Sequence, residues 1–240
     1  VNAGGTKIVA DLAVEHGVSK FVLVSTDKAV NPTNVMGASK LIAEMYCRGL
    51  SHGSGATNFI TTRFGNVLGS NGSVILRFRK QIESGGPVTV TDPEVSRYFM
   101  SIPEACQLVL EAGAMGKGGE IFIFDMGESM KIDDLAKKMI KLSKLKLNKD
   151  IHLVYTGLRK GEKLIEELLN DGENTTPTHH PKIMIAKVEE QEWEAVLKNT
   201  QSLIDLFDAQ DNDAIVSMMK KMLPEYQSSN SEFEKLDKKV

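Results

Sequence analysis

The chain has 240 residues, of which 41% are hydrophobic, and its formal net charge is −3. That length suffices for one large α/β domain with a small lobe and a proper core, while the weak charge argues against nucleic acid as the main partner. Cys47 and Cys106 are too few for a disulfide framework and lack metal-ligand spacing, and neither a signal peptide nor an apolar run of about 18 residues occurs. We therefore expect a cytoplasmic chain that makes no membrane contact of its own and binds no metal.

Strands and helices alternate in the first 172 residues. Helical spacing of apolar residues predicts a helix over 6–16, and the apolar run 21–25 predicts a parallel strand that is buried on both faces. A polar turn containing Pro32 then leads into a helix over 36–50. Further strands are predicted at 58–64, 120–127 and 150–157, with a short edge strand at 87–92, and further helices at 74–83, 101–115 and 131–145. This alternation predicts an α/β fold with a doubly wound parallel sheet.

The character of the sequence changes after residue 172. Two amphipathic helices are predicted at 189–208 and 211–222, so residues 173–223 are expected to form a C-terminal helical extension. Residues 224–240 are polar and charged, which is typical of a frayed, disordered tail.

Polar residues follow the apolar run 21–25 directly. Ligands in open α/β sheets bind beyond the carboxyl ends of the strands, so Thr26, Asp27 and Lys28 are well placed for chemistry. A solvated turn with a local ion pair is the alternative. Met36 and Lys40 are spaced i and i+4 and therefore share one face of the next helix, although a lone Met is more often a core residue and a lone Lys usually faces solvent.

Four segments carry a resemblance to a known family: STDKAVNPTNVMGASK from Ser25, RFGNVLGSNGSV from Arg63, VSRYFMSIPEA from Val95 and TGLRKGEKLIEEL from Thr156. Together they resemble the extended short-chain dehydrogenase/reductase superfamily and, within it, the UDP-N-acetylglucosamine 4,6-dehydratases of bacterial polysaccharide biosynthesis. The resemblance implies that 1–172 form the carboxyl-terminal part of a Rossmann-like sheet. A small α/β substrate-binding lobe would be interleaved at about 70–100 and 150–172.

The resemblance implies NAD as the cofactor and a UDP-sugar as the substrate. In this reaction hydride leaves sugar C4 for NAD, the C5 proton and C6 hydroxyl are lost, and hydride returns at C6. Oxidation at C4 makes the C5 hydrogen acidic, so the site needs one base and one acid. By resemblance Lys28 is the base at C5, Asp27 is the acid at the C6 hydroxyl, and Lys40 holds the nicotinamide ribose. Ser25 and Thr26 would also lie against the cofactor.

The superfamily's helix normally carries Tyr-x-x-x-Lys, and here Met36 stands at the Tyr position, in M-G-A-S-K. This departure resembles the long-chain, membrane-associated branch of these dehydratases. A thioether can neither accept nor give a proton. The base for the sugar C4 hydroxyl must therefore come from elsewhere, and Asp27, Thr26 and a relayed water remain the candidates.

The resemblance also assigns residues to the nucleotide. They are Asn66, Arg97 and Arg159 for the diphosphate, the segment from Ser70 for the nucleotide, and Glu162 for the uridine ribose. Arginine suits phosphate because its fork can bond two oxygens at once. Lys160 replaces the Pro that is common in R-P-G-E-K, and this change is expected to loosen the loop.

The strand, GxGxxG and helix that open the family, together with its adenosine site, have no counterpart in the sequence. We therefore expect a fragment of a longer parent protein, which an N-terminal segment could anchor to the inner membrane. The 240-residue chain alone is expected to have little activity and to bind NAD poorly. Exposed sheet edges also predict association, such as a homo-oligomer.

Two other functions remain open. A UDP-sugar 4-epimerase shares fold and cofactor, although it needs no base at C5 and usually has Tyr where Met36 stands. A non-catalytic nucleotide-sugar binding or assembly module is favoured by the absent Tyr and the missing amino-terminal half.

Overall fold

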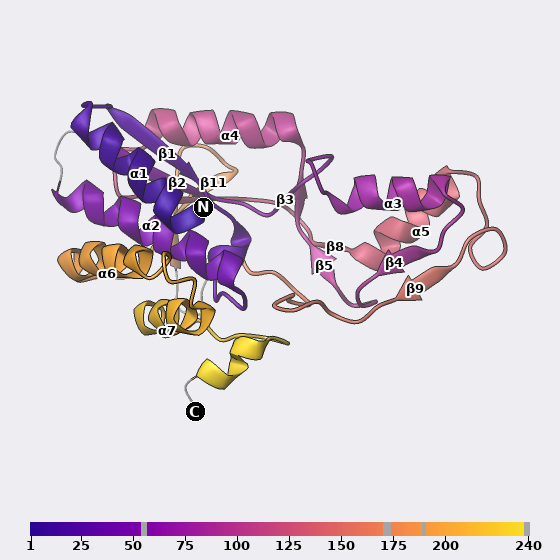
Figure 1. The fold of residues 1–240 in the computed structure, drawn as a ribbon. Helices are drawn as coiled ribbons and strands as arrows, with labels where there is room; N and C mark the ends of the chain where they lie inside the picture. Colours follow the sequence, from indigo (N-terminus) through magenta and orange to yellow (C-terminus); the bar gives the residue numbers. More distant parts are fainter. Residues whose placement is uncertain (54–56, 170–173, 189–190, 238–240) are drawn as a thin grey trace.

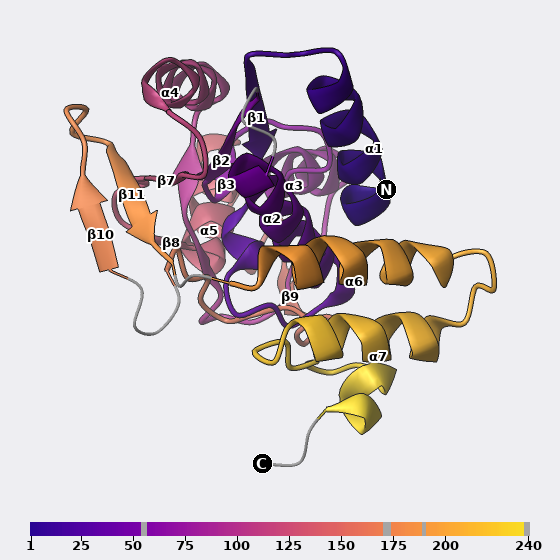
Figure 2. The ribbon, with the colours of Figure 1, turned by 90° about the vertical axis from the view of Figure 1, so that its left-hand side faces the viewer.

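The computed structural model describes residues 1–53, 57–169, 174–188 and 191–237, and it consists of a sheet part and a smaller lobe (Figure 1). The sheet has five strands in the order β1-β2-β7-β11-β10. Three of them are parallel, namely β1 (Lys20–Val24), β2 (Asn58–Arg63) and β7 (Ile121–Phe124). The other two, β10 (Asn174–Pro177) and β11 (Ile183–Lys187), extend the sheet as an antiparallel hairpin (Figure 2). The predicted α/β fold with a Rossmann-like parallel core is confirmed.

Helices cover both faces of this sheet (Figure 2). The elements concerned are α1 (Asn2–Glu15) and α2 (Val35–Gly53) on one face and α4 (Ile102–Met115) on the other. Successive strand residues point to opposite faces, so Phe59 of β2 packs with Ala43 of α2, while Ile60 packs with Leu108 of α4. Both residues are buried, and so are the polar residues Thr61, Thr62 and Arg63 that follow them in β2.

The lobe is built around its own apolar core. Its elements are α3 (Val74–Glu83), α5 (Ile132–Leu142), β4 (Val88–Val90) and β9 (Leu153–Tyr155), of which β4 and β9 pair in parallel. Phe78 of α3 and Ile140 of α5 are fully or almost fully buried in this core together with Ile151. The expected lobe boundaries of 70–100 and 150–172 therefore omitted α5, because the apolar face of α5 packs on α3 and β4 rather than on the sheet.

Two short strand pairs lie where the lobe meets the sheet part (Figure 1). One is β3 (Asn66–Val67) with β6 (Phe99–Met100), which run parallel. The other is β5 (Ser96–Arg97) with β8 (Met130–Lys131), which run antiparallel. Asn66 and Arg97 are thereby held on backbone ladders at the junction, rather than on free loops.

The C-terminal region differs from the expected helical extension over 173–223. Residues 174–177 and 183–187 are the strands β10 and β11, because the apolar side chains of β11 complete the sheet beside β7. The two predicted helices are present as α6 (Trp193–Asp205) and α7 (Asn212–Met222), which pack on α2. The predicted boundary after residue 172 lies outside the described residues. None of the helices in the described ranges combines the length and apolarity needed to cross a membrane.

Residues 224–237 also differ from the expected frayed tail. Tyr226 is 3% exposed and joins the core of α2, α6 and α7, and Phe233 packs against the same cluster. The 3-10 helix η2 (Glu232–Leu236) carries a capping box at Ser231. Lys220 of α7 donates hydrogen bonds to Ser228 and Asp237. A few apolar anchors in a polar sequence thus fix this segment.

Candidate active site

The turn after β1 is tied to the end of the neighbouring strand. The backbone N–H of Ser25 donates to the carbonyl of Thr62 at 2.8 Å, and that of Asp27 donates to Phe64 at 3.1 Å. Asp27 then opens the short 3-10 helix η1 (Asp27–Ala29), whose N-cap is Thr26. These bonds place Thr26, Asp27 and Lys28 at the carboxyl end of the parallel strands, where open α/β sheets bind ligands.

Helix α2 packs directly on this turn, and a glycine makes the contact possible. A Cβ on Gly37 would lie 2.1 Å from the carbonyl oxygen of Lys28. Any larger residue at that position would push the helix and the turn apart. Gly37 therefore sets the position of the Lys28 backbone relative to α2.

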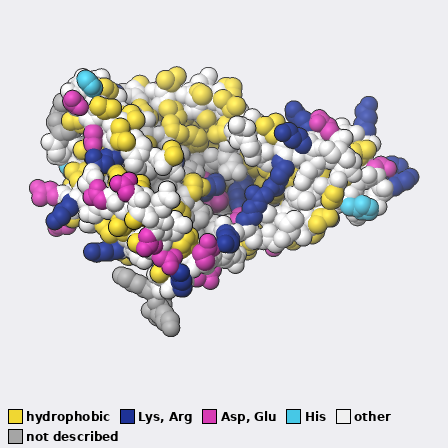
Figure 3. Space-filling view, viewed as in Figure 1, with side chains coloured by type: hydrophobic (Ala, Val, Ile, Leu, Met, Phe, Trp, Pro, Cys, Tyr) yellow, Lys and Arg dark blue, Asp and Glu magenta, His cyan; other side chains and the backbone are white. Residues whose placement is uncertain are grey.

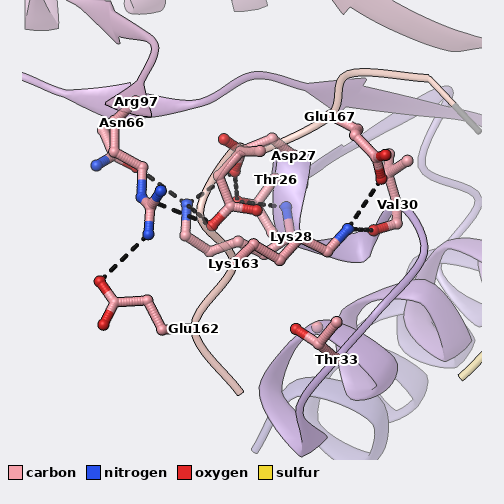
Figure 4. Close-up of polar contacts among 12 residues, drawn as sticks. Thr26, Asp27, Lys28, Val30, Thr33, Asn66, Arg97, Glu162, Lys163 and Glu167 are labelled. Atoms are coloured by element: carbon pink, nitrogen blue, oxygen red, sulfur yellow. Dashed lines mark hydrogen bonds and ion pairs between the residues drawn. The ribbon is translucent and has the colours of Figure 1, made fainter. Parts of the chain in front are cut away.

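Asp27 and Lys28 form a hydrogen-bonded pair (Figure 4). The Oδ1 atom of Asp27 accepts from Thr26 Oγ1 at 2.8 Å and from Lys28 Nζ at 2.9 Å. Lys28 Nζ also donates to Asn66 Oδ1 at 3.0 Å. Asp27 is fully buried, and its Oδ2 atom has no hydrogen-bond partner among the described residues. That oxygen lies against Gly65, where an added Cβ would come within 3.0 Å of it.

A cavity of about 170 Å³ opens between the lobe and the junction strands, and it reaches this pair through Asn66, which lines the cavity and accepts a hydrogen bond from Lys28. Its polar lining residues are Asn66, Arg77, Thr91, Arg97, Arg159 and Glu162. Figure 3 shows Lys and Arg side chains gathered in the hollow between the two parts of the molecule. The structure thus brings together four of the residues expected to bind nucleotide: Asn66, Arg97, Arg159 and Glu162.

Glu162 organises the two expected arginines. Its Oε1 accepts from Arg97 Nη2 at 3.3 Å and from Thr91 Oγ1 at 3.0 Å, and its Oε2 accepts from the backbone N–H of Arg159 at 3.1 Å. Arg97 is 6% exposed and also donates to the carbonyls of Ser96 and Leu164. The Glu162 carboxylate thereby links three residues that line the cavity and fixes their relative positions.

Arg77 is a cavity residue that the sequence analysis did not single out. It lies in the first turns of α3, directly after the glycine-rich loop, and that position is the signal that could have identified it. Burial and the positive charge of Arg159 lower the pKa of the Arg77 guanidinium. Two like charges held together in one cavity favour an anionic ligand.

Glu166 is a second residue that was missed, although it lies within the segment TGLRKGEKLIEEL. It is 5% exposed, and its Oε1 atom lies 3.9 Å from Lys28 Nζ and 3.7 Å from Arg97 Nε. Its Oε2 atom is buried without a hydrogen-bond partner among the described residues. Burial raises the pKa of the Glu166 carboxyl and Asp27 adds to the rise, whereas Lys28, Arg97 and Lys163 oppose it.

The other expected site residues lie outside this network. Met36 is 43% exposed, and Lys40 Nζ donates to the carbonyl of Val24 at 3.2 Å. Ser70 Oγ donates to Val67 at 2.9 Å, and the cavity is lined by Gly72 and Val74 rather than by Ser70. The hydroxyl of Ser25 is buried without a hydrogen-bond partner among the described residues.

Possible metal ligands do not form a cluster in the part of the chain that the structure describes. No group of three or more His, Cys, Asp or Glu residues in these ranges is arranged to hold a metal ion.

Comparison with known proteins places the chain in a family. Residues 1–188 match the model of the polysaccharide biosynthesis protein family. The capsular polysaccharide biosynthesis protein CapD of Staphylococcus aureus is 58% identical over 188 residues, which cover 78% of this chain and 31% of CapD. A UDP-N-acetylglucosamine 4,6-dehydratase (inverting) of Campylobacter jejuni is 36% identical, over 72% of this chain and 50% of that protein. A UDP-glucose 4-epimerase of Rickettsia rickettsii is 37% identical with the same two coverages. The matched part of the chain thus spans 31% to 50% of the length of these relatives.

Solved structures agree on the fold. Pen from Bacillus thuringiensis superposes with a TM-score of 0.72 at 32% identity, covering 84% of this chain and 68% of that one. A dTDP-glucose 4,6-dehydratase from Bacillus anthracis, solved in complex with NAD, has a TM-score of 0.60 at 19% identity and covers 70% and 58%. Sequence motifs, fold and family model point the same way. The chain belongs to the polysaccharide biosynthesis protein family, within the extended short-chain dehydrogenase/reductase superfamily of nucleotide-sugar enzymes.

Proposed function

We propose that the protein containing this chain converts a UDP-N-acetyl-hexosamine to its 4-keto-6-deoxy form in an NAD-dependent dehydration, as a step of bacterial polysaccharide biosynthesis. The observation that supports this best is the pairing of Asp27 with Lys28 at 2.9 Å beside an arginine-lined cavity. Such a dehydration needs an acid and a base side by side, and this pair supplies both.

The cavity suits the diphosphate of the substrate. Arg77, Arg97 and Arg159 supply positive charge, and arginine can bond two phosphate oxygens at once. Val74, the first residue of α3, and Gly72 in the loop before it line the cavity, and the N-terminus of a helix favours anions. Pockets for whole drug-sized ligands measure about 300–1,000 Å³, so a cavity of about 170 Å³ takes one part of the nucleotide-sugar.

The residues expected beside the cofactor fit NAD in one respect. The buried Ser25 hydroxyl at the end of β1 lacks a partner among the described residues and could bond a cofactor group there. Lys40 stands at the start of α2 and reaches the end of β1 through Val24, which suits a contact with the nicotinamide ribose. When bound, NAD would accept the hydride from sugar C4 and return it at C6.

The Asp27–Lys28 pair can handle both proton transfers of the dehydration. We assign Lys28, in its amine form, to remove the C5 proton, and Asp27, in its acid form, to protonate the departing C6 hydroxyl as water. The pair then consists of an ammonium and a carboxylate. When hydride returns at C6, the Lys28 ammonium would give its proton back to C5 and regain the amine form. Asp27 is then the carboxylate that accepts the proton of the next C4 hydroxyl, and its 2.9 Å hydrogen bond to Lys28 keeps the two groups side by side.

Met36 cannot accept the proton of the sugar C4 hydroxyl. Thr26 offers that proton another route. Its Oγ1 donates to Asp27 Oδ1 at 2.8 Å. A substrate hydroxyl that donates to Thr26 would therefore be linked to the Asp27 carboxylate through one hydroxyl. We assign Thr26 this relay role, with Asp27 as the final acceptor.

The test is an assay of the full-length protein with UDP-N-acetylglucosamine and NAD. We expect a 4-keto-6-deoxy product, detected by NMR and mass spectrometry, and its loss in Lys28→Ala. Lys131→Ala is the matched control, because Lys131 is exposed and pairs with Glu94 in the lobe. Unchanged product formation in Lys28→Ala would favour a binding or assembly module instead.

A UDP-sugar 4-epimerase is the second candidate, and the similarity to the Rickettsia rickettsii epimerase is what favours it. An epimerase inverts C4 and leaves C6 untouched, so it would give an isomer of unchanged mass. The pairing of Lys28 with Asp27 has no part in that reaction, which is why we rank it second. The same assay separates the two, since dehydration lowers the product mass by one water.

A further inference from the structure

Glu166 occupies a position between the two halves of the candidate site. It follows Ile165, which forms a bridge to Ser96 on the junction strand β5. That bridge sets Glu166 beside Arg97 of the cavity wall on one side and Lys28 of the β1 turn on the other. The residue belongs to neither the proposed acid–base pair nor the proposed phosphate contacts.

A single oxygen of Glu166 faces both cations. Oε1 lies 3.9 Å from Lys28 Nζ and 3.7 Å from Arg97 Nε, while the buried Oε2 lacks a partner among the described residues. Both distances exceed those of a hydrogen bond, so the contact is mainly a charge interaction. In a buried site such an interaction is strong and depends on whether the carboxyl is ionised.

We propose that Glu166 is a positioning residue that links Arg97, at the diphosphate end of the site, to the charge state of Lys28. The inference rests on the function proposed above only in that Lys28 is the group that takes the C5 proton. While Glu166 is ionised, it stabilises the ammonium form of Lys28. When Glu166 is protonated, this attraction is lost, and Asp27 remains as the carboxylate that pairs with Lys28.

The binding of a diphosphate would change the charge of Glu166 in a defined direction. The charged groups that act on Glu166 are Lys28 and Asp27 of η1, Arg97 of β5 and the nearby Lys163, and burial already favours its protonated form. A diphosphate that engages Arg97 adds negative charge and draws the guanidinium away from Glu166. Both effects favour protonation of Glu166, so Lys28 loses one carboxylate neighbour when substrate arrives.

The experiment measures how readily Lys28 is acylated as a function of pH in the full-length protein. Competitive labelling with acetic anhydride, read by peptide mass spectrometry, reports the fraction of Lys28 in the amine form. The measurement is made with and without saturating UDP, in wild type and in Glu166→Gln. It requires no turnover, so it separates a failure of this inference from a failure of the proposed reaction.

Without UDP we expect the midpoint of Lys28 labelling to lie about one pH unit lower in Glu166→Gln than in wild type. With saturating UDP this difference should become smaller, because the added negative charge favours the protonated form of Glu166, which no longer attracts the Lys28 ammonium. The negative charge of UDP also acts directly on Lys28, but it shifts the labelling midpoint equally in both proteins. It therefore does not contribute to the difference between them. Equal midpoints without UDP, or a difference that UDP leaves unchanged, would overturn the proposal.

Two further variants guard against a purely structural effect. Glu166→Asp keeps the charge and should restore the wild-type midpoint and its response to UDP. Glu167→Gln changes the adjacent residue, whose carboxylate pairs with Lys163 and is half-exposed, and it should label like the wild type. If Glu167→Gln shifts the midpoint as much as Glu166→Gln does, the effect belongs to the segment and the proposal fails.

Discussion

The Nζ atom of Lys160 lies 2.6 Å from Oε2 of Glu232, so the loop that carries Arg159 and Glu162 is paired with the C-terminal 3-10 helix. The backbone adds to this contact. Gly161 N–H donates to the Ser229 carbonyl at 2.6 Å, and Ser229 N–H donates to Thr33 at 3.2 Å. The loop was expected to loosen because Lys160 replaces a proline. In the structure this loop is instead held by hydrogen bonds and an ion pair to the C-terminal segment.

The first prediction concerns this contact. Removing residues 224–240 should weaken UDP binding about tenfold, because the loop with Arg159 and Glu162 loses its backbone partner. Glu232→Gln alone should change affinity less than about twofold, since exposed ion pairs contribute little. Isothermal titration with UDP measures both, and Lys235→Ala, whose partner is Asp213, is the control. Wild-type affinity in a folded, truncated chain would contradict the prediction.

The second prediction concerns Gly37. Replacement by Ala should destabilise the chain by about 3 kcal/mol, because the new Cβ would meet the Lys28 carbonyl at 2.1 Å. Gly5→Ala is the matched control in α1. A Cβ there meets nothing within 4 Å, so it should stabilise by about 0.5–1 kcal/mol. Urea denaturation distinguishes the two, and a Gly37→Ala variant as stable as wild type would show that α2 can move away from the turn.

The third prediction follows from the raised pKa of Glu166. The folded chain binds this proton more tightly than the unfolded chain, whose glutamate pKa is about 4.3. Its contribution to stability is therefore complete below that pH and is lost as pH rises through the folded pKa. Glu166→Gln removes this dependence. The unfolding free energy of the variant relative to wild type should rise between pH 4 and pH 7, and a flat or falling difference would be the opposite result.

The fourth prediction concerns the two cysteines. Burial, with a smaller effect of Glu44, raises the pKa of the Cys47 thiol to about 12. At pH 8 it therefore stays a thiol, which does not react with iodoacetamide. Cys106 is exposed, so native labelling should modify Cys106 alone, while labelling in urea should modify both. Modification of Cys47 in the native chain would show that α2 opens readily.

Much of the sheet part could be predicted from the sequence because its signals are local. The strands β1 and β7 are short apolar runs, β2 is a short run of aromatic and β-branched residues, and helices lie between them. The residues after β1 are polar. Ser101 and Pro103 likewise mark the start of α4, and the Ser101 side chain accepts from the backbone of Glu104 as an N-cap should. In each case the residues that decide the structure lie within one or two turns of each other.

The packing of the lobe and the burial of Glu166 could not be predicted, because they depend on contacts between residues that are distant in the sequence. The amphipathic pattern of α5 fits the face of the sheet as well as it fits the lobe. The choice depends on apolar residues of the lobe that are distant in the sequence, such as Phe78 and Ile151. Glu166 and Glu167 are neighbours of the same type in a segment without periodicity. One is 5% exposed and the other faces solvent, because the bridge between Ser96 and Ile165 turns Glu166 inward. No local pattern encodes that difference.

Helix α2 begins beside the candidate active site and continues between the sheet and the pair α6 and α7 (Figure 2). Its outward face is therefore occupied by the chain's own C-terminal helices. A second copy could use that face only after α6 and α7 had left it. The exposed side chains of Ile8, Val9 and Leu12 on α1 can be reached without such a rearrangement, so assembly through α1 would leave the packing of α2 unchanged.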